Sequence, residues 1–347
     1  METSLCRELK FDQTPPPKES PFASSLFRRF SPSPVFDTYW RFAAARQAIF
    51  FRRLAGTPPP WTDDPILYQF KFTNVYRASD RVSQFLIREV IYKGDQSIRE
   101  VFFRVILFKL FNKIETWQLI TNAFGEPLTT ATSLSTVEKL LTNVQLSGLK
   151  IYSGAYIMPS GTGALKADRK HQSHLYLLRD MLNQSVPERM VDCRTMGQAF
   201  ALLRSYPMIG DFLAYQYVTD LNYSAVINFS ESEFVMPGPG AKSGIHKCFQ
   251  NLNGLTESDL IKMVTDEQER EFDRLRLDFQ FLPGRRLQYI DCQNLFCEVD
   301  KYSRIFHPEI SGLSGRTRIK QLFRPSAVAP SAWYPPKWGV NDQLPRA

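Results

Sequence analysis

Hydrophobic residues recur at helical spacing along most of the chain, and this pattern predicts a mainly α fold. Residues 35–54 repeat aromatic and aliphatic side chains every three or four positions, with arginines on the remaining face. Residues 98–111 are apolar almost all round, which predicts a buried helix. Alternation with a period of two never persists long enough to predict a sheet. Further helices are expected over 65–70, 74–92, 116–123, 134–143, 170–184, 196–205, 211–221, 257–276 and 287–302, and from Ala241 onwards.

The pattern divides the chain into three parts. Residues 1–33 are rich in proline and serine, which indicates a disordered arm. Residues 34–325 carry the helical patterns, and a chain of 347 residues is long enough to bury a substantial core. We therefore expect a single helical domain over 34–325. Residues 326–347 form a tail rich in proline and tryptophan that we expect to wrap the surface.

Composition narrows the class of protein. A net charge of +8 and a pI of about 9.2 favour a partner that carries phosphates. Five cysteines without a C-x-x-C pair indicate free thiols in a reducing compartment. No apolar run approaches the ~18 residues that span a bilayer, so we expect no membrane partner. Hydrolase, zinc-protease and dinucleotide fingerprints are missing, so neither a metal nor a cofactor is predicted.

The stretch MPGPGAKSG, residues 236–244, predicts a tight turn that opens a helix. Such a turn points several backbone N–H groups out of one helix N-terminus, which suits an anion. A Walker A loop would require glycine at 236 and 241, where Met236 and Ala241 stand. The turn therefore favours a helix-hairpin-helix that grips a nucleic-acid backbone, and a plain glycine-capped loop is the alternative. The candidate DNA-backbone contacts are Gly238, Gly240, Lys242, Ser243, Gly244 and Lys247, with Arg316 and Arg318 from a basic cluster around 312–315.

A second candidate site lies in FTNVYRASDR, residues 72–81. Asn74, Arg77 and Arg81 stand at helical spacing, so one helix face would present an amide and two guanidiniums, with Asp80 close to Arg77 to orient it. An asparagine can pair with a base edge, and an arginine can pair with a phosphate or a base. The alternative is a capping residue with surface ion pairs.

A third candidate site lies on the helix predicted over 287–302. Asp291 and Glu298 are seven residues apart and share a helix face, and Asn294 lies between them. Buried carboxylates need partners, and such a need in a cleft indicates a function. A structural ion-pair network is the alternative. The candidates here are Asp291, Gln293, Asn294, Glu298, Asp300 and Lys301.

Together these segments resemble the helical domain associated with 5-hydroxymethyl-deoxyuridine (5-hmdU) DNA kinases, a group akin to the α-glutamyl/putrescinyl-thymine pyrophosphorylases. The resemblance implies a fold similar to the helix-hairpin-helix DNA glycosylases, acting on or near a modified thymine in DNA. It also implies one pocket formed by Asn74, Arg77, Asp80 and Arg81 with Asp291, Glu298, Asp300 and Lys301. The matching stretches are YWRFAAARQAIFFRRL (39–54), PWTDDPIL (60–67), FTNVYRASDR (72–81), IGDFLAYQYVTDLNYS (209–224), MPGPGAKSGIHKCF (236–249) and QNLFCEVDKYSR (293–304).

One departure limits the resemblance. The phage kinases of this group join the helical domain to a P-loop kinase domain, and this sequence contains no Walker A motif, so we do not expect ATP-dependent phosphorylation from this polypeptide alone.

The sequence thus predicts a DNA-binding protein that accommodates an extruded thymine-derived base. Asn74 with Gln293 or Asn294 would read the base, and Arg77 and Arg81 would hold a phosphate or the modified group. If the protein is an enzyme, it would be a base-modifying transferase or glycosylase-like, with Asp291, Glu298, Asp300 and Lys301 as catalytic candidates. A non-catalytic reader that recruits a modification enzyme, or a helical interaction scaffold, remains open. The DNA role implies the nucleus of a eukaryote, or otherwise the cytoplasm.

Overall fold

The computed structural model describes residues 25–154, 157–159, 167–325 and 332–344, and it is built from helices. These residues form fifteen α-helices, and the sheet-like pairings among them are isolated bridges such as Phe70 with Leu322. The prediction of a mainly α fold is therefore confirmed. Within the described ranges, no helix has the length and apolar character needed to cross a membrane.

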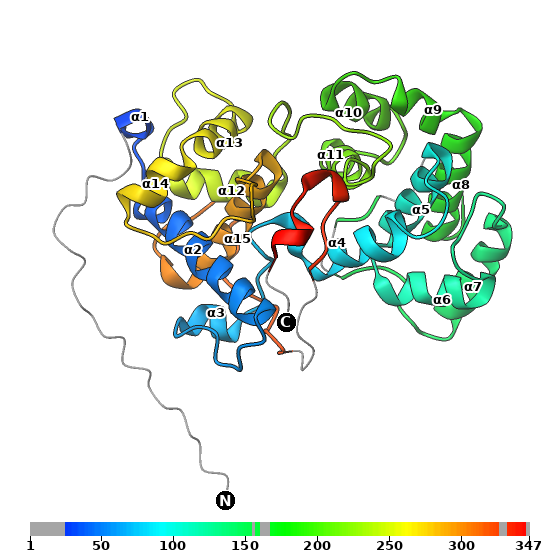
Figure 1. Cartoon of the computed structure of the whole chain (residues 1–347), viewed down its shortest axis with the longest axis horizontal. Coiled ribbons are helices and arrows are strands. Elements are labelled where there is room, and N and C mark those ends of the chain that lie inside the picture. Colours follow the sequence, from blue (N-terminus) through cyan, green and yellow to red (C-terminus); the bar gives the residue numbers. More distant parts are fainter. Residues whose placement is uncertain (1–24, 155–156, 160–166, 326–331, 345–347) are drawn as a thin grey trace, which may run out of the picture.

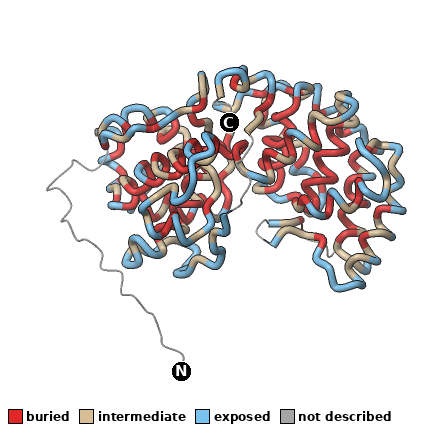
Figure 2. The backbone as a smooth tube through the Cα atoms, turned by 60° about the horizontal axis from the view of Figure 1, so that its bottom comes forward, coloured by how far each residue is buried: buried red, intermediate tan, exposed pale blue. Residues whose placement is uncertain are grey.

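The helices gather into two groups (Figure 1). The first group is built from both ends of the chain, with α12 packed on α15 and both packed on α2. The second group is built from the middle of the chain around α5, which contacts α8, α9 and α11. Figure 2 shows buried positions along the helices inside both groups.

The bounds of the helices follow the chain. The first group contains α1 (Ser25–Arg28), α2 (Pro34–Leu54), α3 (Pro65–Gln69), α12 (Pro239–Cys248), α13 (Glu257–Asp266), α14 (Gln268–Arg274) and α15 (Tyr289–Phe306). The second contains α4 (Arg81–Phe85), a π-helical turn η2 (Leu86–Ile91), α5 (Ile98–Phe111), α6 (Ile114–Phe124), α7 (Leu134–Leu146), α8 (Lys170–Asn183), α9 (Val186–Val191), α10 (Met196–Arg204) and α11 (Asp211–Leu221).

Local sequence explains where several helices begin. Ser33 accepts a hydrogen bond from the backbone N–H of Val35, and Pro34 occupies the first position of α2. Asp64 caps α3 in the same way, by accepting from the N–H groups of Ile66 and Leu67. The side-chain oxygen satisfies donors that have no partner inside the helix, which fixes the start of each helix.

The predicted N-terminal arm is shorter than residues 1–33. Phe27 and Phe30 are fully buried, and their rings lie 5.9 and 6.1 Å from the ring of Phe249. Two buried aromatic rings attach residues 25–33 to the first helix group, so this part of the arm is folded. Residues 1–24 lie outside the described residues.

Two of the expected helices are interrupted. Residues 74–92 form a 3-10 turn η1 (Arg77–Ser79), then α4, then η2, because Tyr76 and Asp80 adopt extended backbone angles. The prediction that Asn74, Arg77 and Arg81 share one helix face is therefore wrong. The stretch 257–276 divides into α13 and α14 at Glu267. The short α9 was not predicted.

The C-terminal segment 332–344 lies between the two helix groups (Figure 1). It contains two single-turn 3-10 helices, η3 (Pro336–Trp338) and η4 (Asn341–Gln343). Tyr334 and Val340 are fully buried, so this part of the predicted tail contributes to the core.

Candidate functional site

The segment 72–81 lies along one face of α15, which brings two of the predicted sites together. Glu298 Oε2 accepts a hydrogen bond from the Thr73 N–H at 2.9 Å, and Asp291 Oδ1 accepts from the Arg77 N–H at 2.8 Å. Between them, Asn294 Nδ2 donates to the Thr73 hydroxyl at 3.0 Å and to the Asn74 carbonyl at 3.2 Å. The shared face expected for these three α15 side chains exists, and it holds the backbone of the segment.

Asn74 and Asp80 form the outer part of this contact. Asp80 Oδ1 accepts from the Asn74 N–H at 2.7 Å, and Asn74 Nδ2 donates to the Ser79 carbonyl at 2.7 Å. The Asn74 Oδ1 atom is buried and has no hydrogen-bond partner among the described residues. A buried acceptor without a donor is costly, so a ligand donor that reaches this atom when the segment 72–81 shifts would be favoured.

Asp80 titrates near neutral pH. Burial raises the pKa of Asp80 to about 7, although the hydrogen bond from Asn74 and the nearby Arg46 oppose this rise. The sequence suggested that Asp80 orients Arg77, but the structure pairs Arg77 with Asp220 instead. Asp80 is thus an additional candidate proton donor or acceptor.

The raised pKa of Asp80 makes the stability of the protein depend on pH. A carboxyl that ionises at pH 4 in the unfolded chain but near pH 7 in the folded one binds more protons when folded, so its contribution to stability falls as pH rises through this window. Asp80→Asn removes the titration and keeps an oxygen that accepts from Asn74. We expect the variant to gain about 2 kcal/mol over the wild type between pH 5 and pH 8. Urea unfolding of both proteins at pH 5 and at pH 8 measures the difference between their free energies of unfolding. The same difference at both pH values would contradict the prediction.

Arg77 points its guanidinium into a buried cluster of charged side chains next to the segment 72–81. Its Nη1 donates to Asp220 Oδ1 at 2.6 Å and to the Tyr223 hydroxyl at 2.9 Å, and its Nε donates to Gln216 Oε1 at 3.0 Å. Lys109 Nζ lies 3.1 Å from the other Asp220 oxygen. The predicted phosphate role of Arg77 therefore has no support, because its guanidinium links η1 to α11.

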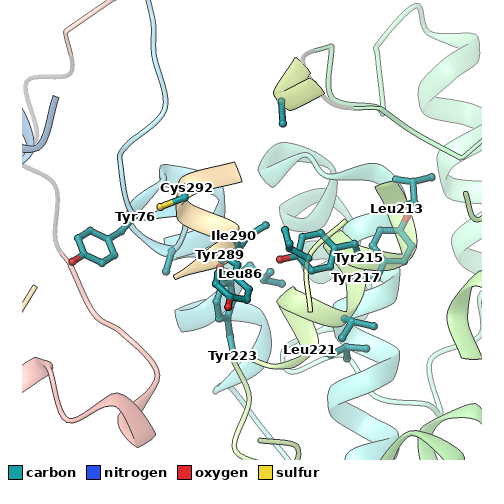
Figure 3. Packing of buried hydrophobic residues seen from close by; sticks show 14 of the residues in the cluster. Tyr76, Leu86, Leu213, Tyr215, Tyr217, Leu221, Tyr223, Tyr289, Ile290 and Cys292 are labelled. Carbon is teal, nitrogen blue, oxygen red and sulfur yellow. The ribbon is translucent and has the colours of Figure 1, made fainter. Parts of the chain in front are cut away.

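The cluster places one carboxylate, Asp220, between two cations, Arg77 and Lys109. Burial disfavours the Asp220 carboxylate, but Arg77 and Lys109 outweigh this effect and lower the pKa of Asp220. Burial lowers the pKa of Lys109 to about 8 despite the attraction of Asp220. Figure 3 shows Tyr215 and Tyr217 of α11 on one side of the start of α15, and Tyr76 on the other. Sequence reasoning missed Asp220 and Lys109, although charged residues within otherwise apolar helices were a visible signal.

The glycines of the 236–244 turn allow close packing of helices. A Cβ added at Gly244 would lie 2.0 Å from the Phe296 carbonyl oxygen, and one at Gly240 would lie 2.4 Å from Cys297 Sγ. A Cβ at Gly238 would lie 2.7 Å from the Phe212 ring. Position 244 requires glycine because α12 approaches the backbone of α15 there, whereas the atoms nearest to Gly238 and Gly240 belong to side chains.

The same interface removes several predicted DNA contacts from the surface. Ser243 Oγ donates to Asp300 Oδ1 at 2.8 Å, and Lys247 Nζ donates to the Asp300 carbonyl at 3.0 Å. Ser243, Gly244 and Lys247 are buried, so they contact no phosphate in this arrangement. Asp300 faces α12 rather than the segment 72–81, because two residues along a helix rotate a side chain to the opposite side. The eight residues that the resemblance places around one pocket are therefore separated in the structure.

The remaining basic candidates are exposed. Arg81, Lys242, Arg316 and Arg318 are all on the surface. The segment that carries Arg316 and Arg318 is fixed beside the site, since the Lys71 N–H donates to the Gln321 carbonyl at 3.0 Å. Lys301 Nζ donates to Glu298 Oε2 at 2.8 Å and lies 4.5 Å from the centre of the Phe72 ring. Gln293 is buried with its Oε1 atom unpartnered in the described part of the chain.

Comparison with known proteins gives one family. The model of the helical domain of 5-hmdU DNA kinases matches residues 33–312. The 5-hmdU DNA kinase of Bacillus phage SP10 is 25% identical over 295 residues, which cover 79% of this chain and 46% of the phage protein. The chain therefore spans less than half the length of that relative. No solved structure matches this chain. Since the family model covers most of the chain, this protein belongs to the 5-hmdU DNA kinase helical-domain family.

Proposed function

We propose that the protein binds DNA and recognises a thymine-derived base, of the 5-hydroxymethyluracil kind, where the segment 72–81 meets α15. The buried, unpartnered Oδ1 of Asn74 carries this proposal. A thymine-type base presents one N–H donor on its pairing edge, and a hydroxymethyl group adds an O–H donor. An amide oxygen that lacks a donor matches either group, and only the hydroxymethyl O–H, which thymine lacks, would distinguish the two bases. The phage relative, named a 5-hmdU DNA kinase, supports the same class of base.

Neighbouring groups suit the rest of a nucleotide. The exposed guanidinium of Arg81 follows Asp80 directly and can hold a phosphate, and Lys301 can add positive charge. Gly238 is buried against Phe212, so at the N-terminus of α12 the half-buried Gly240 and the exposed Lys242 would offer an N–H group and a cation to the backbone, as in a helix-hairpin-helix DNA glycosylase. Arg316 and Arg318 would extend this contact along the duplex. Reading a base in this way requires that the base leaves the stack.

Chemistry at the base would require a group that exchanges protons near neutral pH. Asp80 meets this requirement, and Asp291 approaches it, because burial raises the pKa of Asp291 to about 6. Glu298 and Lys301 would act as a pair that positions the segment and the base. Asp300 is separated from this group by its contacts with α12.

A second candidate function is a non-catalytic reader that recruits a separate modification enzyme. The contacts of Asp291 and Glu298 favour it, because both carboxylates accept backbone N–H groups of the segment 72–81. Such carboxylates hold a loop in place and need not react. Analysis of nucleosides by mass spectrometry after incubation separates the two, since a reader leaves every base unchanged.

Asn74→Ala tests the proposed base contact. We expect the variant to lose its preference for a duplex with 5-hydroxymethyluracil over one with thymine, by roughly tenfold, because one side chain that reads a base contributes about 1–3 kcal/mol of discrimination. Phosphate contacts remain, so the dependence of affinity on salt should not change. Fluorescence anisotropy with both duplexes measures this.

Asn143→Ala is the matched control, because Asn143 is an exposed asparagine on α7 in the second helix group. This variant should keep the wild-type preference. Thermal unfolding of both variants verifies that they are folded. A folded Asn74→Ala variant that still prefers the modified duplex would remove Asn74 from the reading of the base.

A further inference from the structure

The C-terminal segment 332–344 packs against the elements that form the candidate site. The Tyr334 hydroxyl lies 2.6 Å from Ser79 Oγ, and the Trp333 N–H donates to Gln84 Oε1 at 2.8 Å. Ser79 is also the residue whose carbonyl accepts from Asn74 Nδ2 at 2.7 Å. The buried end of this segment and the proposed base contact therefore meet at one residue.

Tyr334 places an aromatic ring with a polar edge inside the protein. The side chain is fully buried, and its ring lies 5.9 Å from the ring of Trp338 in a stacked arrangement. Trp338 in turn lies 3.4 Å from the Arg285 guanidinium and 5.6 Å from the Tyr223 ring. Aromatic rings and an arginine plane are the groups on which proteins stack nucleic-acid bases.

Hydrogen bonds within the segment join its two ends. Asn341 Oδ1 accepts from the Tyr334 N–H at 2.8 Å, and Asn341 Nδ2 donates to the Tyr334 carbonyl at 2.9 Å. This reciprocal pair joins both ends of the segment to each other. Lys337 Nζ donates to the Ile227 carbonyl at 2.8 Å, and burial lowers the pKa of Lys337 to about 8. An ammonium group in a poorly hydrated position regains hydration when the segment undocks. This gain lowers the free-energy cost of undocking.

We propose that residues 332–344 are a displaceable strap, and that Tyr334 fills the place of a thymine-derived ring until DNA displaces it. This inference rests on the proposed function. A phenol ring and a pyrimidine ring are both planar and of similar size, and both carry a polar group that can reach Ser79. A docked strap leaves only a fraction of the molecules competent to bind, so it lowers the apparent affinity for DNA by that fraction.

The double substitution Tyr334→Ala with Trp338→Ala in the full chain tests the strap. We expect it to bind a duplex that contains 5-hydroxymethyluracil roughly tenfold more tightly than the wild type, because the competing segment no longer docks. Asp342→Ala is the control, because Asp342 is an exposed residue of the same segment, and it should bind as the wild type does. Unchanged or weaker binding by the double variant would overturn the strap.

Hydrogen exchange of the wild-type protein tests the same idea without a substitution. Backbone amides of 333–341 should exchange faster when the duplex is added, since the strap is displaced. Slower or unchanged exchange in DNA-saturated protein would show that the segment is a fixed part of the fold. If neither the wild type nor the double variant binds the duplex, the proposed function fails. If the wild type prefers the modified duplex and the double variant gains no affinity, only the strap fails.

Discussion

Asp220→Asn should destabilise the protein by about 3–5 kcal/mol, because it leaves two buried cations without their counter-ion. Asp220 lies 2.6 Å from Arg77 Nη1 and 3.1 Å from Lys109 Nζ, and all three side chains are buried. Lys109 can lose its proton, since burial already lowers its pKa to about 8, but the guanidinium of Arg77 cannot. The destabilisation should therefore decrease as pH rises toward 9. Urea unfolding at pH 7 and pH 9 measures both effects.

Asp211→Asn provides the matched control for Asp220. Asp211 lies on α11, the helix that carries Asp220, and pairs at 2.5 Å with Arg204 of α10, but both side chains are about half exposed. Water screens such a pair, so the loss should stay below about 1 kcal/mol. Equal losses for the two variants would mean that the buried cluster contributes no more than a surface ion pair.

Gly244→Ala should destabilise the protein by about 3 kcal/mol, because the added methyl group would overlap the backbone of α15. The new Cβ would lie 2.0 Å from the Phe296 carbonyl oxygen, and a backbone atom cannot rotate away. Helix propensity alone predicts the opposite sign, a gain of about 1 kcal/mol for alanine over glycine. A lower thermal midpoint for Gly244→Ala than for the wild type therefore indicates steric overlap, and a higher one indicates helix propensity.

Gly197→Ala controls for this propensity effect. Gly197 lies in α10, and an added Cβ would lie 3.5 Å from the nearest atom, in the Phe234 ring, which is ordinary contact. This variant should be neutral or slightly more stable. If Gly244→Ala behaves the same way, close packing of α12 on α15 is not what requires the glycine.

The sequence predicts this fold well where the helical pattern is strong. Residues 98–111 are apolar almost all round and form α5 with the predicted bounds. The spacing of Asp291 and Glu298 correctly indicates that they share a face of α15. In these cases the residues within one helix determine the result, so no knowledge of distant contacts is needed.

The prediction of one helix over 74–92 fails because Tyr76 and Asp80 are extended, and tertiary hydrogen bonds hold the start of the segment on α15. The N–H groups of Thr73 and Arg77 donate to Glu298 and Asp291 of α15, more than 200 residues further along the chain. Local periodicity contains no information on such partners. The turn at 236–244 illustrates a second limit, since a glycine is required wherever any group approaches the backbone. Sequence alone does not say whether that group is a phosphate or the neighbouring helix α15.

The affinity of the wild-type protein for matched duplexes tests the central claim most directly. One duplex carries thymine and the other carries 5-hydroxymethyluracil at the same position, and both are titrated at low and at moderate salt. We predict tighter binding to the modified duplex at both salt concentrations, with affinity for both falling as salt rises. Equal affinity for the two duplexes, or no binding to either, would contradict the recognition of a modified base by this protein.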